Sequence, residues 1–204
     1  MRRKSEEKRQ CIIATAKKIF IRKGFNATPM SEISASVGGS KATLYNYFSS
    51  KEVLFGAVMQ QIADDIAGPL FTILKDEEAP LKNVLIKFGV AYLTFVLSPQ
   101  TIAMRRMALA ELHTLAHGEE IFRRGPIAQW EKMAGFFEKN MQSGRMKKAD
   151  AWRTTMQFLT LIEQEYSYFS LLGIQKKLSA EAIKASVETS VDIFWHYYAL
   201  PPAR

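Results

Sequence analysis

A pair of glycines, Gly38-Gly39, constrains the fold more than any other feature of this sequence. The segment before the pair begins with Thr28-Pro29, a threonine N-cap followed by a proline at the first helical position, which is typical of a helix start. Apolar side chains then recur at intervals of three and four residues, at Met30, Ile33 and Val37. Because glycine readily adopts the left-handed backbone conformation, the pair predicts a tight stop to this short helix.

The segment after the glycines has the pattern of a second short helix. Ser40 is its predicted N-cap, and Leu44 and Phe48 form its inner face at a spacing of four residues. Two short helices joined by a glycine turn are typical of a helix-turn-helix motif.

The outward side chains of the second helix are small or polar, which suits the major groove of a DNA duplex. Ala42 and Thr43 can approach base edges, and hydroxyl groups and the Lys51 ammonium suit phosphate oxygens. An alternative is that the rings of Tyr45 and Tyr47 merely cover the core. The residues expected to contact DNA are Thr28, Ser40, Lys41, Ala42, Thr43, Tyr45, Asn46, Tyr47 and Lys51.

The first quarter of the chain resembles the DNA-binding domain of the TetR family of transcriptional regulators. The resemblance is carried by Gly24-Phe25, Thr28, Ile33 and the run SKATLYNYFSSKEVL from Ser40 to Leu54. Gly39 replaces the usual valine and Ala42 a common glycine, whereas Tyr47 occupies a position where His or Tyr is usual. The resemblance implies a DNA-binding homodimer with an effector cavity among its middle helices.

Charge is distributed unevenly along the chain. Residues 1–51 contain 11 Lys and Arg against 3 Asp and Glu, whereas the other 153 residues contain 17 of each kind. The whole net charge of +8 therefore belongs to the predicted DNA-binding end, as expected for a segment that binds a polyanion. A basic end that lies on a membrane surface is the alternative, but the apolar residues there are needed for a core.

The compartment is predicted from one cysteine and the absence of export signals. Cys11 alone cannot form an intrachain disulfide, which favours a reducing compartment. The basic N-terminus is not followed by a clean apolar segment and a small-residue cleavage site. The longest uncharged run, Phe88 to Met104, is shorter than the ~20 apolar residues of a membrane span. We therefore expect a cytoplasmic protein without a membrane partner.

Apolar periodicity predicts helices throughout and no competing strand, so the expected fold class is all-α. Gly68-Pro69 weakens the fourth helix, and Gly125-Pro126 kinks or breaks the seventh. The helices are expected at residues 5–23, 29–37, 41–48, 50–68, 81–97, 100–115, 119–142, 150–172 and 179–200. Ser49 and Ser50 start the fourth of them, and Asp150 and Ser179 are the N-caps of the last two.

The helices are expected to form two domains. Residues 1–51 form the helix-turn-helix DNA-binding domain, and residues 52–204 form a helical domain for effector binding and dimerisation. The helix that begins near Lys51 leaves the first domain and enters the second, so it is expected to act as the lever between them.

The middle of the chain is rich in aromatic residues and methionines, which form a core more often than a ligand cavity. Resemblance to the family favours a cavity for an apolar or aromatic effector. Glu163 is unusual in its apolar surroundings, and a groove-facing or solvent-facing carboxylate is the alternative to a ligand anchor. The candidate lining residues are Phe88, Tyr92, Met104, Met107, Trp130, Phe137, Phe158, Glu163 and Tyr166.

An apolar stripe on the last helix predicts a two-fold dimer, which selects a pseudo-palindromic DNA site. The stripe could instead be buried within the core of the monomer. Its members are Ile183, Val187, Val191, Phe194 and Tyr198.

The sequence gives little evidence for an enzyme active site or a metal site. Glu163 and Glu165 would point to roughly opposite faces of one helix, and no nucleophile with an adjacent base is evident. His113 and His117 have the spacing of a metal pair but lack an evident third ligand, so neither metal nor cofactor is expected.

The sequence thus predicts a transcriptional regulator, most simply a repressor whose dimer leaves its operator when a small molecule binds. The alternatives are a DNA-binding dimer without an effector, and a helical ligand-binding protein or enzyme whose basic end serves assembly.

Overall fold

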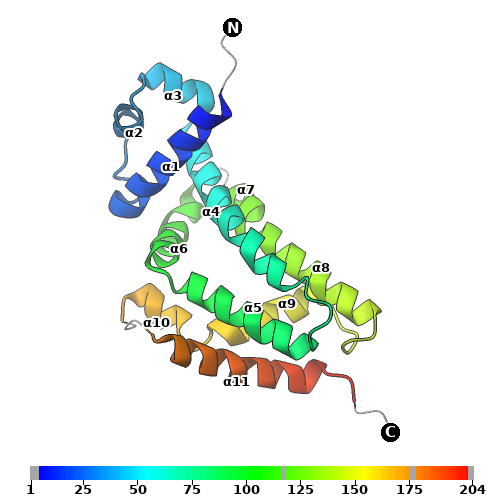
Figure 1. The fold of residues 1–204 in the computed structure, drawn as a ribbon. Helices are drawn as coiled ribbons and strands as arrows, with labels where there is room; N and C mark the ends of the chain where they lie inside the picture. Colours follow the sequence, from blue (N-terminus) through cyan, green and yellow to red (C-terminus); the bar gives the residue numbers. More distant parts are fainter. Residues whose placement is uncertain (1–4, 116–117, 175–177, 202–204) are drawn as a thin grey trace. The chain divides into compact units, whose positions relative to one another are not determined.

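The computed structural model describes residues 5–115, 118–174 and 178–201, and this part of the chain is helical without a strand (Figure 1). The α-helices are α1 (Glu6–Lys23), α2 (Met30–Ser36), α3 (Lys41–Tyr47), α4 (Lys51–Ile73), α5 (Leu81–Val96), α6 (Pro99–Glu111), α7 (Gly118–Phe122), α8 (Ala128–Gln142), α9 (Ala151–Glu163), α10 (Ser167–Leu172) and α11 (Ala180–Tyr198). A 3-10 turn (Leu112–Thr114) follows α6, and a π-helical turn (Arg123–Ile127) joins α7 to α8. The prediction of an all-α fold is confirmed.

Several helix starts follow from side-chain caps that the sequence predicted. The hydroxyl groups of Ser40, Ser50 and Ser179 each accept a hydrogen bond from the backbone N–H three residues later, and the Asp150 carboxylate does the same. Such caps satisfy backbone donors that have no partner within the helix.

Three helix boundaries differ from the prediction. Helix α4 continues through Pro69 to Ile73, because Leu70 and Leu74 beyond the proline are buried in the core. The predicted helix over 150–172 is interrupted by a turn after Glu163 and becomes α9 and α10. The predicted kink at Gly125-Pro126 takes the form of the π-helical turn.

The chain forms two compact units, and their division differs from the one predicted at residue 51. The first unit comprises Met1–Asp64 and Ala103–Pro126, and the second comprises Asp65–Ile102 and Ile127–Arg204. The start of α4 belongs to the first unit because Phe55 packs against Phe20 and Phe25, with ring centroids 5.7 and 5.1 Å apart. This aromatic cluster buries the end of α1, the loop after it and α4 together.

In the second unit, α5, α9 and α11 pack on one another, and α8 packs on α9 (Figure 1). Gly89 permits the close approach of α5 to its neighbours, because a Cβ atom at this position would lie 2.7 Å from the Val187 side chain and 3.1 Å from Ile162. Phe137, Phe158 and Phe194 fill the centre of this core.

No single described helix is both long and apolar enough to span a membrane. Helices α5 and α6 together are long and apolar enough, by length and composition alone, but the pair is bent.

Candidate functional site

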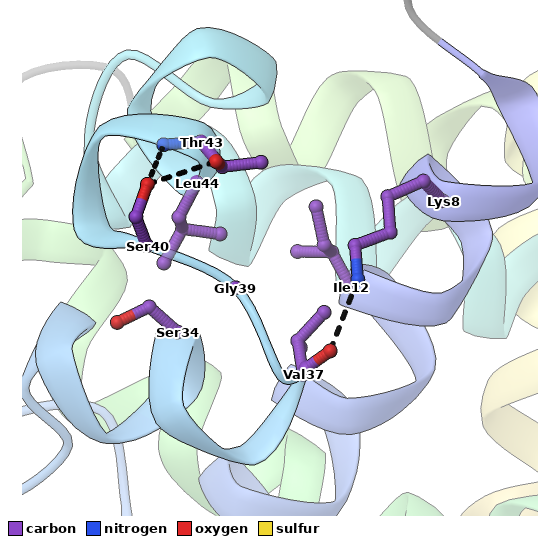
Figure 2. Close-up of a pocket in the computed structure, with 8 residues that line it drawn as sticks. All are labelled: Lys8, Ile12, Ser34, Val37, Gly39, Ser40, Thr43 and Leu44. Atoms are coloured by element: carbon purple, nitrogen blue, oxygen red, sulfur yellow. Dashed lines mark hydrogen bonds between the residues drawn. The ribbon is translucent and has the colours of Figure 1, made fainter.

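Helix α3 is held in place by contacts at the turn before it. Gly38 has φ of 68°, the left-handed conformation that the sequence predicted for this turn. The Lys8 ammonium of α1 donates a 3.0 Å hydrogen bond to the Val37 carbonyl at the end of α2, as Figure 2 shows. The turn between α2 and α3 is therefore fixed both by its own backbone and by α1.

The side chains of α3 divide into an inner, a flanking and an outer set. Leu44 and Phe48 are buried on the inner side, as predicted. Lys41, Ala42, Tyr45 and Asn46 are exposed and form the outer face, since positions three and four residues apart share a side of a helix. We call these four residues the outer face of α3. It carries an ammonium, a methyl, a phenol and an amide, all groups that can meet base edges or phosphates.

Thr43 and Tyr47 flank this face and are only half exposed. The hydroxyl groups of Thr43 and Ser40 form a 2.9 Å hydrogen bond with each other (Figure 2). The Tyr47 hydroxyl accepts a 3.1 Å hydrogen bond from the Ser5 backbone N–H, which ties the start of α1 to the end of α3. Both side chains therefore have positioning contacts within the first unit.

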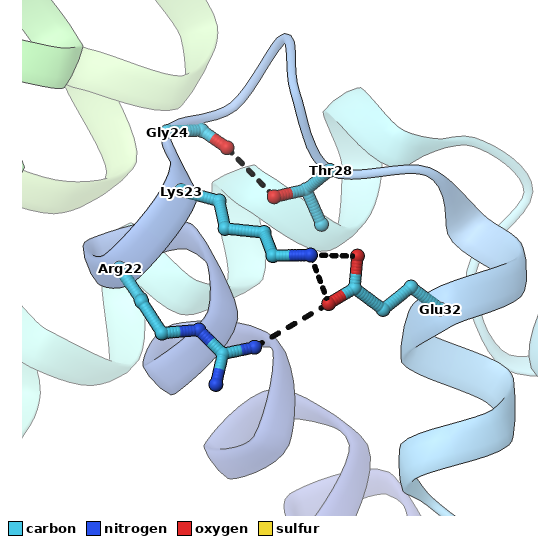
Figure 3. A network of polar contacts seen from close by, with 5 residues as sticks. All are labelled: Arg22, Lys23, Gly24, Thr28 and Glu32. Atoms are coloured by element: carbon cyan, nitrogen blue, oxygen red, sulfur yellow. Dashed lines mark hydrogen bonds and ion pairs between the residues drawn. The ribbon is translucent and has the colours of Figure 1, made fainter.

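Thr28 does not occupy the position predicted for it. Its side chain is 0% exposed, and its hydroxyl donates a 2.7 Å hydrogen bond to the Gly24 carbonyl, as Figure 3 shows. Pro29, not Thr28, is the N-cap residue of α2. Thr28 therefore closes the loop between α1 and α2, and the prediction that it caps α2 and contacts phosphate is wrong.

Lys51 also has an internal role. Its ammonium donates hydrogen bonds to the backbone carbonyls of Phe25 at 2.9 Å and Asn26 at 3.5 Å, and it lies 4.3 Å from the centroid of the Phe25 ring. These contacts fasten the first turn of α4 to the loop after α1. The side chain was expected to point toward phosphate, but the structure directs its charge inward.

The same loop region contains an ion-pair network. Glu32 on α2 pairs with Lys23 at 2.7 Å and with Arg22 at 3.4 Å, both in the last turn of α1 (Figure 3). Part of the positive charge counted from the sequence is therefore neutralised within the first unit. Lys41 on the outer face of α3 has no such role in this network.

Two hollows lie beside α3. The one drawn in Figure 2 has a volume of about 10 Å³, which is room for a single water molecule and not for a ligand. The other is an open hollow of about 450 Å³ lined by the first residues of α2 and α4 and by Lys41 and Tyr45. Hydroxyl groups and backbone N–H groups at helix starts suit an anion such as a DNA phosphate.

The predicted effector residues do not all come together. Met104 and Met107 are buried in the core of the first unit, whereas the other seven belong to the second. The prediction grouped them because the middle of the chain is rich in aromatic residues and methionines and the family resemblance implies an effector cavity there. Phe88, Phe137 and Phe158 are fully buried in ring-to-ring contacts within the core of the second unit.

The remaining candidates are half buried at the border of that core. Trp130 packs edge-on against Trp152, with ring centroids 6.4 Å apart. Burial raises the pKa of the Tyr166 phenol, and the neighbouring Glu165 carboxylate, with which it forms a hydrogen bond, raises it further. Tyr166 therefore stays protonated at neutral pH and can donate a hydrogen bond.

Glu163 forms a polar cluster that the sequence did not predict. Its Oε1 accepts a 2.5 Å hydrogen bond from the Tyr92 hydroxyl of α5, and its Oε2 accepts a 2.7 Å hydrogen bond from the Ser167 hydroxyl of α10. We call Tyr92, Glu163 and Ser167 the Glu163 cluster. A charged residue within an apolar run was the only sequence signal for it, because the pairing joins residues far apart in the chain.

The apolar stripe predicted for dimerisation is part of the monomer core. Val187 and Val191 are 0% exposed, and they pack against α5 and α9 together with Ile183, Phe194 and Tyr198. The prediction that this stripe forms the dimer interface is wrong, and the alternative that it is buried within the monomer is correct.

A different face of α11 carries exposed apolar side chains. Ile193 is 57% exposed and Tyr197 is 61% exposed, and Tyr168, Phe169 and Leu172 of α10 are exposed as well. We call these five residues the exposed apolar set. In the sequence, this set is indicated only by the spacing of four residues between Ile193 and Tyr197. The stripe that contains Val187 and Val191 has the same kind of spacing and more members.

Of the predicted histidine pair, His117 lies outside the described residues. His113 is exposed, and no group of three potential metal ligands occurs among the described residues.

Comparison with known sequences connects this architecture to a family. Residues 12–58 match the sequence model of "Bacterial regulatory proteins, tetR family", and residues 83–200 match that of "AefR-like transcriptional repressor, C-terminal domain".

Curated relatives match over the N-terminal region. The chain is 37% identical to the HTH-type transcriptional regulator RutR of Escherichia coli over 77 residues, which cover 38% of this chain and 36% of RutR. It is 28% identical over 72 residues to the HTH-type transcriptional repressor DhaR of a Mycobacterium species, covering 35% of this chain and 36% of DhaR. The match therefore spans about a third of the length of these relatives.

Solved structures are similar over almost the whole chain. A TetR-family transcriptional regulator from Mesorhizobium loti superposes with a TM-score of 0.88 at 21% identity, covering 98% of this chain and 100% of that one. The flavonoid-responsive regulator FrrA superposes with a TM-score of 0.73 at 28% identity, with the same coverage.

Proposed function

Because this chain belongs to the TetR family of transcriptional regulators, we propose that it is a dimeric repressor that leaves its operator when an aromatic effector binds its second unit. Membership in the family makes the chain a transcriptional regulator and not an enzyme. Action on chromosomal DNA requires a cytoplasmic location.

The outer face of α3 is the observation that carries the proposed DNA binding. Lys41, Ala42, Tyr45 and Asn46 are exposed on a helix whose opposite side is buried, so a bare helix face is available for the major groove. Ser40 and the hollow lined by Lys41 and Tyr45 provide hydroxyl and ammonium groups for the flanking phosphates. Thr43, Tyr47 and Lys51 would act by holding this face in position.

Dimerisation is proposed through the exposed apolar set. Ile193 and Tyr197 are exposed one turn apart on α11, and exposed apolar side chains that lie together favour an interaction with another protein surface. A two-fold dimer presents two copies of α3 and therefore selects a pseudo-palindromic operator.

The effector is proposed to be an aromatic molecule with hydroxyl groups. The second unit offers aromatic rings together with the polar Glu163 cluster, and small-molecule sites typically combine apolar and aromatic side chains with a few polar groups. The flavonoid-responsive regulator FrrA, which is similar over nearly the whole chain, supports this class of compound.

The DNA-binding part of the proposal is tested by sequencing the genomic fragments that the purified protein retains and then titrating the enriched site by fluorescence anisotropy. A pseudo-palindrome is expected, with log affinity falling linearly as log salt concentration rises. Equal retention of all fragments, or an affinity independent of salt, would contradict it.

The effector part is tested by a thermal-shift screen of hydroxylated aromatic compounds followed by operator titration with each hit. A hundredfold loss of operator affinity requires ~2.7 kcal/mol of coupling, which is within the usual allosteric range. Trp130→Ala and Tyr166→Ala should weaken this response and retain operator binding without the effector. Hits that raise the melting temperature and never change operator affinity would show a dimer without effector control.

A further inference from the structure

Glu163 is placed where a carboxylate is electrostatically unfavourable. It is the last residue of α9, and the C-terminal end of a helix carries partial negative charge from unpaired carbonyl groups. The side chain is also half buried beside the aromatic core of the second unit. A residue that opposes both the helix dipole and its apolar surroundings is expected to serve something other than stability.

The carboxylate is held by hydroxyl groups from two other helices. Tyr92 of α5 donates to one oxygen at 2.5 Å, and Ser167 of α10 donates to the other at 2.7 Å. Ser167 is buried, and α5, α9 and α10 all belong to the second unit (Figure 1). One side chain therefore joins three helices through hydrogen bonds that a competing donor can replace.

The Tyr92 contact shows which chemical group this carboxylate accepts. The Tyr92 ring is stacked on Phe88, with centroids 6.0 Å apart and planes 9° from parallel, while its phenolic O–H reaches Glu163. Phe88 in turn contacts Phe71 and Phe158, at centroid distances of 6.2 Å each. Phe88 and Phe158 are themselves buried, so a ligand ring would take the place of the Tyr92 ring, with the carboxylate at the distance of a ring hydroxyl.

We infer that Glu163 is the residue that recognises the effector, by accepting a hydrogen bond from its phenolic hydroxyl in place of Tyr92. This inference rests on the proposed function, because it assumes an aromatic effector in the second unit. Exchange of the donor releases α5 from α9, so ligand recognition and the change in helix contacts occur at the same carboxylate. A ligand shifts a conformational equilibrium only by its differential affinity, and the exchanged hydrogen bond supplies such a difference.

The experiment uses the full chain and a matched pair of probes, the flavone apigenin and its fully O-methylated derivative. The methyl ethers keep the aromatic surface and remove every hydroxyl donor. Affinity is measured by calorimetry for the wild type, for Glu163→Gln and for Glu138→Gln. Glu138 is the control because it is an exposed glutamate of α8 in the second unit and accepts its own hydrogen bond from Gln142 at 3.3 Å.

Wild-type protein should bind apigenin ~10- to 100-fold more tightly than the methylated derivative, as expected for one hydrogen bond to a charged acceptor. Glu163→Gln should lose most of this preference by weakening apigenin alone, and Glu138→Gln should keep it. Melting temperatures of the ligand-free variants identify any loss of folding, and Tyr92→Phe, which keeps the ring, should bind apigenin at least as tightly as the wild type.

Other outcomes overturn the inference in distinguishable ways. An undiminished preference for apigenin in Glu163→Gln would remove Glu163 from recognition while leaving effector control intact. Tighter binding of the cation rhodamine 6G than of apigenin, lost in Glu163→Gln, would make the carboxylate a counter-ion instead. Failure of both flavones to bind a protein that still binds its operator would reject the phenolic class, whereas failure of operator binding itself would reject the proposed function.

Discussion

Helix α3 in the first unit and helix α11 in the second each bury one side and expose the other, and they differ in what they expose. On α3 the exposed residues include Lys41, Tyr45 and Asn46, which carry polar groups. On α11 most of them are polar as well, but Ile193 and Tyr197, one turn apart near its end, are large and mostly apolar. A polar, basic face suits a phosphate-rich groove, whereas an apolar face suits another protein surface.

The buried sides of the two helices, in contrast, are alike. Leu44 of α3 and Val187 and Val191 of α11 are all nearly inaccessible to water, and each packs within its own unit. The buried side therefore determines how each helix folds into its unit, and the exposed side determines the partner. This distinction yields predictions that differ for neighbouring residues of one helix.

The largest effect is expected for Val191→Asp, on the buried side of α11. Burial of an unpaired carboxylate costs several kcal/mol, so the free energy of unfolding should fall by at least ~3 kcal/mol. Urea unfolding followed by circular dichroism measures the change. The matched control is Ala185→Asp, which introduces the same charge at an exposed position of α11 outside the exposed apolar set and should change the free energy of unfolding by less than ~1 kcal/mol. Equal losses in both variants would refute the division of α11 into two faces.

The double change Ile193→Glu and Tyr197→Glu should convert a dimer into a folded monomer. Interface side chains at buried centres contribute ~2 kcal/mol or more each, and two carboxylates facing their symmetry mates add repulsion. Light scattering at micromolar concentration measures the mass, and Leu109→Glu is a control at an exposed apolar residue of α6. A monomeric wild type would reject the proposed interface. A variant that stays dimeric would assign the interface to another surface.

Much of the fold could be predicted from local patterns in the sequence. The N-caps Ser40, Asp150 and Ser179 and the turn at Gly38 depend on neighbouring residues, and all of them agree with the structure. The break after Glu163 could not be predicted, because the apolar periodicity continues into α10 without a Gly or Pro.

The direction of individual side chains could not be predicted in the same way. The stripe containing Val187 and the pair Ile193 and Tyr197 have the same type of spacing, and only the positions of α5 and α9 decide which one is covered. Lys51 was expected to contact phosphate because its ammonium suits phosphate oxygens, yet two backbone carbonyls and the Phe25 ring attract it. Such contacts arise from residues distant in sequence.

A smaller effect is expected for Asn46→Ala, on the outer face of α3. An asparagine side chain can form two hydrogen bonds to adenine, and their loss costs ~1 to 3 kcal/mol of discrimination at one base pair. Thr43→Ala is the comparison, because the Thr43 hydroxyl is already bonded to Ser40 and should contribute little to base recognition. Competition assays with single-base operator variants measure both. Loss of discrimination in Thr43→Ala alone would mean that the flanking and outer sets are assigned incorrectly.

The smallest effect on affinity is expected for Lys41→Gln, and its comparison with Lys51→Gln separates a contact to DNA from a contact within the protein. Lys41 is exposed at the start of α3, so its loss should reduce the slope of log affinity against log salt by about 0.9, the value for one phosphate contact, without changing the melting temperature. Lys51→Gln should lower the melting temperature of the first unit, because it removes the bonds to the Phe25 and Asn26 carbonyls, and should leave the slope unchanged. Anisotropy titrations at four salt concentrations and thermal unfolding distinguish the two variants. If Lys51→Gln reduced the slope as much as Lys41→Gln, its ammonium would have to leave these carbonyls for phosphate when DNA binds, and the inward position of Lys51 would belong to the DNA-free protein alone.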